Sequence, residues 1–187
     1  MALSSNLQSV REVSYLKTKI DAVVFKGTPS RKMLNQWNRN PKIVKIWYEL
    51  ESPIHSQPTV ELDNRINWTA NYRRESTIVT PYEKFVPFDY AETQNKTKIN
   101  HAATKTKMVA WFVSNCRDKN GRLNYAKELG KHVQVDIYGA CGNLSCPRRY
   151  AKDCFTMLDK DYKFYLSFEN SACRDYITEK LFWNALQ

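Results

Sequence analysis

The sequence predicts an α/β fold, because short β-branched or aromatic stretches alternate with stretches of helical period. This alternation is most regular in the second half of the 187 residues. Strands are expected there at residues 108–113, 133–138 and 162–168. Helices are expected at residues 121–129, 148–158 and 176–186. Such a β-α-β-α-β order is typical of a parallel sheet covered by helices, and the 42% hydrophobic content is sufficient for a packed core.

The first half predicts a shorter α/β or mixed segment. Residues 21–25 form a β-branched run, and residues 42–48 alternate apolar and basic side chains as a strand does. Residues 76–80 are a third strand candidate. Between the first two strands, residues 30–37 are expected to form one or two helical turns with Ser30 as the cap.

A polar stretch without periodicity separates the two halves and predicts a linker. We therefore expect an N-terminal domain in residues 1–95, a linker in 96–107 and a second domain in 108–187. The chain stops inside an expected amphipathic helix, so the second domain is predicted to be incomplete. No apolar run reaches the roughly 18 to 20 residues of a membrane span, and the first residues lack the apolar run of a signal peptide.

The net charge of +10 is spread evenly over both halves. Such a surplus fits a polyanionic small ligand, a phosphorylated surface or plain solubility. Nucleic-acid binding is not expected, because it usually shows clustered Lys and Arg. A metal site is not expected either: Asp159 and Asp161 form an Asp-x-Asp spelling, but they precede a strand instead of following one.

All five cysteines lie in the second half, and none forms a C-x-x-C pair, so a structural zinc site is disfavoured. An odd number leaves at least one thiol unpaired within the chain. A short disulfide from Cys141 to either Cys146 or Cys154 is compatible with the spacing in an oxidising compartment. Free buried thiols fit the spacing equally well. The remaining cysteines are Cys116 and Cys173.

Three N-glycosylation sequons begin at Asn67, Asn95 and Asn143. They matter only in a secretory lumen, and one or two are expected by chance in a chain of this length.

Residues 162–186 predict a buried strand, a polar turn and a new helix. Asp175 is the expected N-cap of a helix that begins at Tyr176, which places Glu179 and Lys180 at its start. A ribose diol requires a carboxylate acceptor, and a diphosphate requires a cation beside free N–H donors, so this pair suits a sugar nucleotide. The alternative is a capped helix with two solvated charges.

Residues 168–186 read FENSACRDYITEKLFWNAL and resemble the motif of the α1,3-fucosyltransferases, glycosyltransferase family 10. About a dozen positions match in order. Six further segments are similar to the same family: DAVVF at 21–25, ESP at 51–53, NWTANYR at 67–73, TPY at 80–82, AWFVSN at 110–115 and VDIYGAC at 135–141. Glu83 stands where the family has a glycine. The spelling around Cys141 and Cys146 most resembles the invertebrate branch that fucosylates the innermost N-glycan GlcNAc.

This resemblance implies two Rossmann-like domains of GT-B type, both incomplete here because the chain looks truncated at both ends. It implies an inverting transfer of L-fucose from GDP-fucose to the 3-hydroxyl of a GlcNAc in a glycoprotein N-glycan. No cofactor is required, and a divalent cation is an optional stimulant. The implied location is the Golgi lumen, as a type II membrane protein anchored through a segment missing from this chain.

The resemblance also assigns the catalytic base. Glu51 matches the family's catalytic carboxylate and follows a predicted strand, where it would face a cleft. Glu49 lies two residues earlier, on the same side of the strand, and is the competing candidate. The alternative for either is a solvated charge at a strand end.

The implied donor site consists of Arg122, Asn170, Tyr176, Glu179 and Lys180. The arginine and lysine would stabilise the leaving diphosphate, and the glutamate would bind the ribose. Asn170 and Tyr176 resemble donor-contacting positions. An ordinary surface arginine is the alternative for Arg122.

Ser114 and Asn115 are expected to line the guanosine pocket or to form a plain turn.

Two other functions remain open. A non-catalytic sugar- or nucleotide-binding module could retain the same site residues without turnover. A basic nucleic-acid binder is disfavoured, because no basic stripe with interleaved aromatic residues is present.

Overall fold

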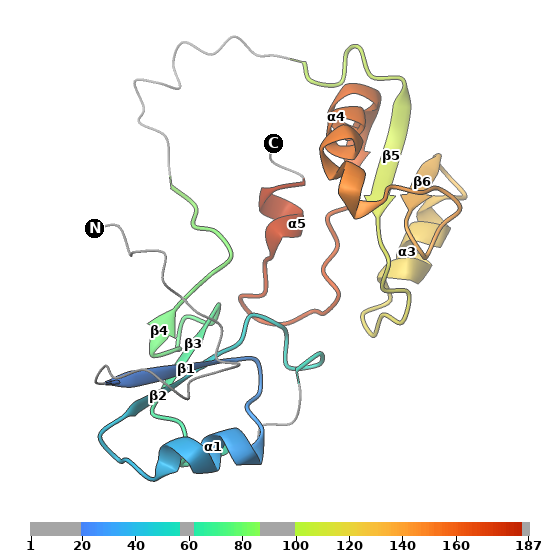
Figure 1. Cartoon of the computed structure of the whole chain (residues 1–187). Helices are drawn as coiled ribbons and strands as arrows, with labels where there is room; N and C mark the ends of the chain where they lie inside the picture. The colour runs from blue at the N-terminus through green and yellow to red at the C-terminus, as the bar shows by residue number, and fades with distance from the viewer. Residues whose placement is uncertain (1–19, 57–61, 87–99, 185–187) are drawn as a thin grey trace.

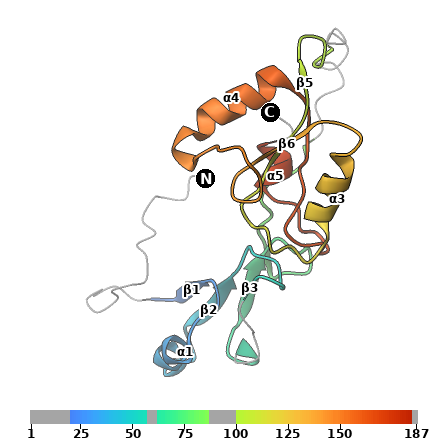
Figure 2. The same cartoon turned by 90° about the vertical axis from the view of Figure 1, so that its right-hand side faces the viewer.

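Two parallel β-sheets organise the computed structural model, which describes residues 20–56, 62–86 and 100–184. In Figure 1 the first sheet and α1 lie in the lower part of the view, and the second sheet and α4 lie in the upper part. Figure 2, turned by 90°, shows α3 beside the second sheet, at the opposite end of the molecule from α1. The predicted α/β class with parallel sheets is confirmed.

The first sheet has the strand order β1-β2-β3-β4, with every pair parallel. The two strands and the helix expected from the first 48 residues are confirmed. β3 was not predicted as a strand, because its four residues, WTAN, are too few to give a clear periodic signal; Ala70 alone among them is buried. The strands are β1 Ala22–Lys26, β2 Val44–Tyr48, β3 Trp68–Asn71 and β4 Ile78–Val79.

Helix α1, Arg31–Asn38, covers one face of the first sheet. Ser30 is its N-cap, as predicted: the Ser30 hydroxyl accepts a hydrogen bond from the Met33 backbone N–H at 3.3 Å. Leu34 on the inner face of α1 packs with Val23 and Phe25 of β1 in the core of this half.

The second sheet has the order β6-β5-β7, again with parallel pairs. β5 lies in the centre, and its side chains alternate between two cores: Ala110 faces one cluster and Trp111 the other. β7 is shorter than the predicted 162–168. The strands are β5 Lys107–Phe112, β6 Val135–Tyr138 and β7 Tyr162–Tyr165.

Helices cover both faces of this sheet. Ala126 of α3 packs with Trp111 and Val113, whereas Leu158 of α4 packs on the other face with Ala110. The expected helix at 148–158 is a 3-10 turn followed by a longer α-helix. The bounds are α3 Arg122–Leu129, η2 Arg148–Tyr150 and α4 Ala151–Asp161.

The last helix begins later than predicted, and Asp175 is not its cap. α5 spans Glu179–Phe182, and Thr178 is the N-cap, whose hydroxyl accepts from the Lys180 backbone N–H. Asp175 instead adopts a left-handed conformation with φ of 61° in the turn before the helix. Because aspartate is a favoured N-cap residue, the sequence pattern placed the start of this helix three residues too early.

Two disulfides form, Cys116–Cys141 and Cys146–Cys154, and Cys173 is free. The prediction of an unpaired cysteine is confirmed. Pairing of Cys141 with Cys146 or Cys154 was wrong, because the sheet brings the loop after β5 against the loop after β6.

Among the described residues, no helix is long and apolar enough to span a membrane. No metal-binding group of three or more His, Cys, Asp or Glu side chains occurs in that part of the chain either.

A buried hydroxyl network stabilises the second sheet, and its removal gives a testable prediction. The Tyr162 hydroxyl lies 2.8 Å from that of Tyr138 and donates to Asp136 Oδ2 at 2.5 Å. Burial, with the neighbouring Asp136, raises the pKa of Tyr162 far above its ordinary value, so the phenol stays a donor. Tyr162→Phe should lower the free energy of unfolding by about 1–3 kcal/mol, measured by urea denaturation.

The matched control is Tyr125→Phe, since Tyr125 is 60% exposed and its hydroxyl makes no hydrogen bond to another residue that the structure describes. It should change stability by less than about 0.5 kcal/mol. Equal stabilities for the two variants would show that the network contributes nothing.

Candidate functional site

The carboxyl end of the first sheet meets the stretch that follows β7. In Figure 1 this stretch, drawn in red, runs from the second sheet down toward β3 before it enters α5. We call residues 169–183 the crossing segment. Ligands of parallel sheets usually sit at the carboxyl ends of the strands, so this meeting place is the candidate site.

The turn after β2 supplies the first sheet's part of the site. Its backbone is fixed locally, because the Glu51 N–H donates to Glu49 Oε1 at 2.9 Å. Glu51 itself is exposed, whereas Ser52 beside it is fully buried. Glu49 thus positions the turn through its carboxylate, and Glu51 remains open to solvent.

Two hydrogen bonds join this turn to the crossing segment. The buried hydroxyls of Ser52 and Ser171 lie 2.8 Å apart, and either can donate. The Tyr176 hydroxyl donates to Glu51 Oε2 at 3.1 Å. Residues more than 100 positions apart in the sequence therefore share one site.

Aromatic rings surround Tyr176, which is only 5% exposed. The ring of Tyr72, just after β3, lies 5.0 Å from it, and the ring of Tyr82, after β4, lies 6.3 Å away edge-on. The Tyr82 hydroxyl donates to the Leu50 carbonyl at 2.8 Å. Burial, and then the charge of Glu51, raise the pKa of Tyr82 to about 12 and that of Tyr176 further. Both phenols are therefore protonated donors at neutral pH.

Two further contacts lie at the rim of the same interface. Arg74 Nε lies 3.8 Å from Asp175 Oδ1, and the Trp183 indole N–H donates to Glu83 Oε1 at 2.8 Å. The resemblance leads us to expect a glycine at position 83. The glutamate found there accepts a hydrogen bond from Trp183, the C-cap of α5.

The predicted pair Glu179 and Lys180 lies in a cluster of charges. Lys180 Nζ is 3.2 Å from Glu169 Oε2 and 3.1 Å from Glu179 Oε1, and it donates to the buried Thr178 hydroxyl at 2.8 Å. Glu169 also accepts from the N–H and the hydroxyl of Thr178. Burial acts to raise the pKa of Glu179, but Lys180 and the hydrogen bonds outweigh it, so this pKa lies below its ordinary value.

Arg122 is buried, at 7% exposed, so the interpretation as an ordinary surface arginine was wrong. Its guanidinium donates to the Phe168 carbonyl at 2.9 Å and the Asn115 carbonyl at 3.0 Å, and stacks over Trp111. Burial lowers its pKa. Arg122 thus links the stretch after β5 to the stretch after β7. A diphosphate would have to compete with the two carbonyls for the guanidinium.

Buried polar atoms without a partner occur on the stretch after β7. Among the described residues, Ser167 Oγ and Asn170 Oδ1 of this stretch have no partner, and neither has Nε of Arg122, the first residue of α3. Buried polar atoms are normally paired, so such atoms at a strand end are suited to a ligand. Asn170 was predicted as a donor-contacting residue. The Asn120 side chain bonds the neighbouring Glu169 carbonyl at 2.9 Å and so helps to fix this loop.

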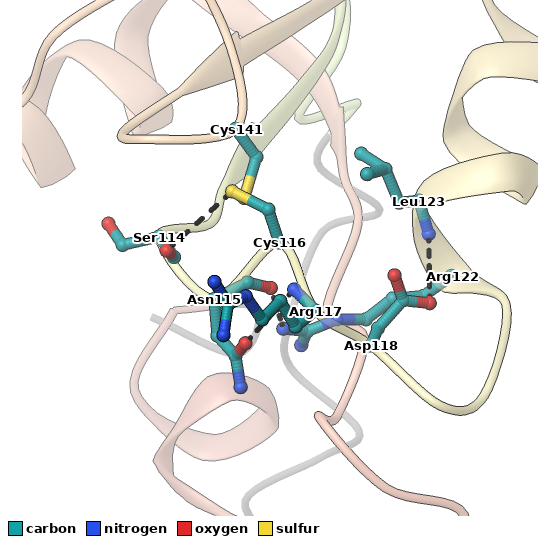
Figure 3. Close-up of a disulfide and its surroundings, with 8 residues drawn as sticks. All are labelled: Ser114, Asn115, Cys116, Arg117, Asp118, Arg122, Leu123 and Cys141. Carbon is teal, nitrogen blue, oxygen red and sulfur yellow. Dashed lines mark hydrogen bonds between the residues drawn. A yellow bond between two sulfur atoms is a disulfide. The ribbon is translucent and has the colours of Figure 1, made fainter.

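A disulfide ties two loops at the carboxyl edge of the second sheet. Figure 3 shows Cys116, in the loop after β5, bonded to Cys141, in the loop after β6. Asn115 and Arg122 lie beside it in the same view. Gly139 has φ of 103°, and a Cβ there would lie 2.5 Å from the Val113 carbonyl, so only glycine allows these loops to approach. Ser114, expected near the guanosine, lies in this cluster with an exposed side chain.

The sequons lie elsewhere. Asn143 is exposed in the loop after β6, and Asn67 Oδ1 accepts from the Lys45 backbone N–H at 2.8 Å. Asn95 lies outside the described residues. A hollow of about 430 Å³ opens against α4 and β7 and is lined in part by Lys105, Lys152 and Trp183; neither Glu51 nor Lys180 lines it.

Sequence reasoning missed several residues of the site. Glu169, Ser171 and Thr178 were seen only as letters of a motif, yet they anchor the crossing segment. Tyr72 and Tyr82 were also quoted without a role. Buried polar partners give no periodic signal, because their importance depends on contacts far away in the sequence.

Comparisons with known proteins give one family. The profile described as "Glycosyltransferase family 10 (fucosyltransferase) C-term" matches residues 102–187, and "Fucosyltransferase, N-terminal" matches residues 7–83.

Three relatives illustrate the range of similarity. Glycoprotein 3-alpha-L-fucosyltransferase A of Drosophila melanogaster is 59% identical over 147 residues, 79% of this chain and 29% of the relative. Alpha-(1,3)-fucosyltransferase fut-1 of Caenorhabditis elegans is 38% identical over 157 residues, 83% of this chain and 36% of the relative. Alpha-(1,3)-fucosyltransferase 7 of Rattus norvegicus is 34% identical over 178 residues, 91% and 44% respectively. The chain spans less than half the length of each.

The two disulfides should differ in their contribution to stability. Cys116 and Cys141 are 25 residues apart, whereas Cys146 and Cys154 are 8 apart. Loop-closure entropy gives about 3.5 kcal/mol for the longer loop and about 2.5 kcal/mol for the shorter one. Replacing Cys116 and Cys141 together with Ser should therefore lower the urea midpoint more than replacing the other pair.

Cys173→Ser is the control and should leave the midpoint nearly unchanged. A larger fall in the urea midpoint on removal of Cys146–Cys154 would show that native-state contacts, and not chain entropy, decide which disulfide stabilises more.

Proposed function

This chain belongs to glycosyltransferase family 10, the fucosyltransferases, and from that premise we propose that it forms part of an inverting enzyme. The enzyme moves L-fucose from GDP-fucose to the 3-hydroxyl of a GlcNAc in a glycoprotein N-glycan. The observation that carries the proposal is the contact of Tyr176 with Glu51, which unites the proposed base with the donor motif. We propose two Rossmann-like domains of GT-B type as the frame, with the site between them.

Glu51 is the proposed base, and the geometry favours it over Glu49. The Glu49 carboxylate accepts the Glu51 N–H and is thereby engaged in the turn. Glu51 is exposed and has a carboxylate oxygen held by a single phenol, so it can approach an acceptor hydroxyl. Proton removal from that hydroxyl would accompany its attack on the fucose carbon and the departure of GDP.

Lys180 is proposed to bind the diphosphate, and Glu179 the ribose diol. Glu169 and Glu179 already neutralise the ammonium, so a diphosphate would have to displace at least one of them. Asn170, with its unpaired amide oxygen, is the proposed acceptor for a donor hydroxyl or base N–H. Arg122 is proposed to act on the diphosphate only after its carbonyl contacts rearrange.

Metal-independent chemistry with no cofactor is proposed, in which Lys and Arg stabilise the leaving group and a divalent cation at most stimulates. The two disulfides are compatible with a secretory compartment, and we propose the Golgi lumen, with membrane anchoring through a segment outside this chain. The acceptor is proposed to be the innermost GlcNAc. The 59% identity to a glycoprotein fucosyltransferase of an insect supports the invertebrate branch.

A non-catalytic binding module is the second proposal. The pairing of Lys180 with two carboxylates would suit a site that is retained for structure. Binding of GDP-fucose without release of GDP in the presence of a GlcNAc-terminated glycan would favour it.

The base assignment is tested by Glu51→Gln. Because the chain spans 29% of the Drosophila relative, activity is measured in a chimaera in which the aligned 147 residues replace the matching stretch of that enzyme. Transfer should fall to background. The GDP affinity, measured by calorimetry, should stay nearly unchanged, because the Glu51 carboxylate is not proposed to contact the diphosphate. Glu49→Gln is the matched control and should retain most of the turnover.

Near-parental turnover in Glu51→Gln would remove Glu51 from the base role.

The phosphate role is tested by Lys180→Ala in the same chimaera. Donor affinity should weaken by about 1.5–3 kcal/mol, which is the usual contribution of a hydrogen bond to a charged group. Lys163→Ala, an exposed lysine on β7, is the control for general loss of positive charge. Equal donor affinities for the parent and Lys180→Ala would count against this role.

A further inference from the structure

Tyr176 has a role that differs from donor contact. Its ring is enclosed by Tyr72 and Tyr82, and its hydroxyl donates to Glu51 at 3.1 Å. A side chain that is 5% exposed and already bonded offers little surface to a sugar nucleotide.

We propose that Tyr176 is a positioning residue that holds the Glu51 carboxylate in place and links it to the donor-binding crossing segment. The inference rests on the proposed function, in which Glu51 is the base. A single phenol hydrogen bond restricts which carboxylate oxygen is free to take a proton. The free oxygen, Oε1, would then face the acceptor.

The rings around Tyr176 make this contact rigid. Tyr72 and Tyr82 come from the ends of β3 and β4, so the phenol is fixed against the first sheet itself. Edge-on and tilted ring contacts have defined geometry and restrict rotation of the phenol. The hydroxyl is thus held in place independently of the flexible glutamate.

A second contact fixes the backbone on both sides. Ser52 follows Glu51 directly, Ser171 precedes Tyr176 by five residues, and their buried hydroxyls lie 2.8 Å apart. The turn and the crossing segment are therefore joined at two points, and this defines their relative position.

The same crossing segment carries the proposed donor residues. Thr178, two residues after Tyr176, is clamped by Glu169, and Lys180 is bonded to both. The residue that holds the base therefore lies on the same short segment as the residues proposed to bind the donor.

The central experiment is Tyr176→Phe in the chimaera with the Drosophila relative. The ring and its aromatic contacts remain, and only the hydrogen bond is lost. We expect kcat to fall by about 10- to 100-fold, the size that follows a small misplacement of a reacting group. The donor KM and the calorimetric GDP affinity should stay within about twofold of the parent. Tyr125→Phe, the same change on an exposed ring, is the control.

A double variant separates positioning from donor contact. In the Glu51→Gln background, where transfer is already at background, Tyr176→Phe should leave the calorimetric GDP affinity unchanged, because the phenol contacts the base and not the donor. Weaker GDP binding in Tyr176→Phe would instead show a donor contact and overturn the proposal. Parental kcat in Tyr176→Phe, with Glu51→Gln inactive, would also overturn it while leaving the base assignment intact. An active Glu51→Gln enzyme would refute the assignment of Glu51 as the base, on which the positioning role of Tyr176 rests.

Glu51→Asp keeps the proposal testable even when the Tyr176→Phe enzyme is too unstable to assay. It retains the charge but withdraws the carboxylate from the phenol by one methylene. The expected result is a fall in kcat with GDP affinity unchanged. Parental kcat for Glu51→Asp would mean that the base needs no fixed position, and the proposal would fail.

Discussion

The docking of the crossing segment on the carboxyl edge of the first sheet is the constraint on which the site depends. Ser52 and Ser171 are both buried, so their hydroxyls must satisfy each other or lose stability. This requirement fixes how the stretch after β7 approaches the turn after β2. Glu51 and Tyr176 then lie within hydrogen-bond reach as a consequence.

Charged residues in the site are held by neighbours before any ligand arrives. Lys180 is paired with Glu169 and Glu179, and Arg122 is bonded to two carbonyls. Such pairing avoids isolated charge in a half-buried region, where desolvation is costly. It also means that an anionic ligand gains only the difference between its own contacts and those that it displaces.

The sequence predicted the elements that depend on local or periodic signals. The strands with β-branched residues, the Ser30 cap and α3 after Gly121 all have such signals. β3 was missed because one short strand with one buried residue has no clear alternation. The start of α5 was misplaced because Asp175 and Thr178 are both capping residues, and the choice is made by Glu169, which binds the Thr178 N–H. The disulfide partners depended on which strands are neighbours, which spacing along the chain does not reveal.

Of the two bonds that join the turn after β2 to the crossing segment, one lies between uncharged groups, the hydroxyls of Ser52 and Ser171, and the other has the Glu51 carboxylate as its acceptor. A pair of serine hydroxyls has no charge to titrate and no ion atmosphere to screen, unlike the peripheral Arg74–Asp175 pair. Added salt would therefore weaken the contact at the rim and leave the bond between the two serine hydroxyls unchanged. The alignment of the turn with the crossing segment thus keeps one fixed point whatever the ionic strength.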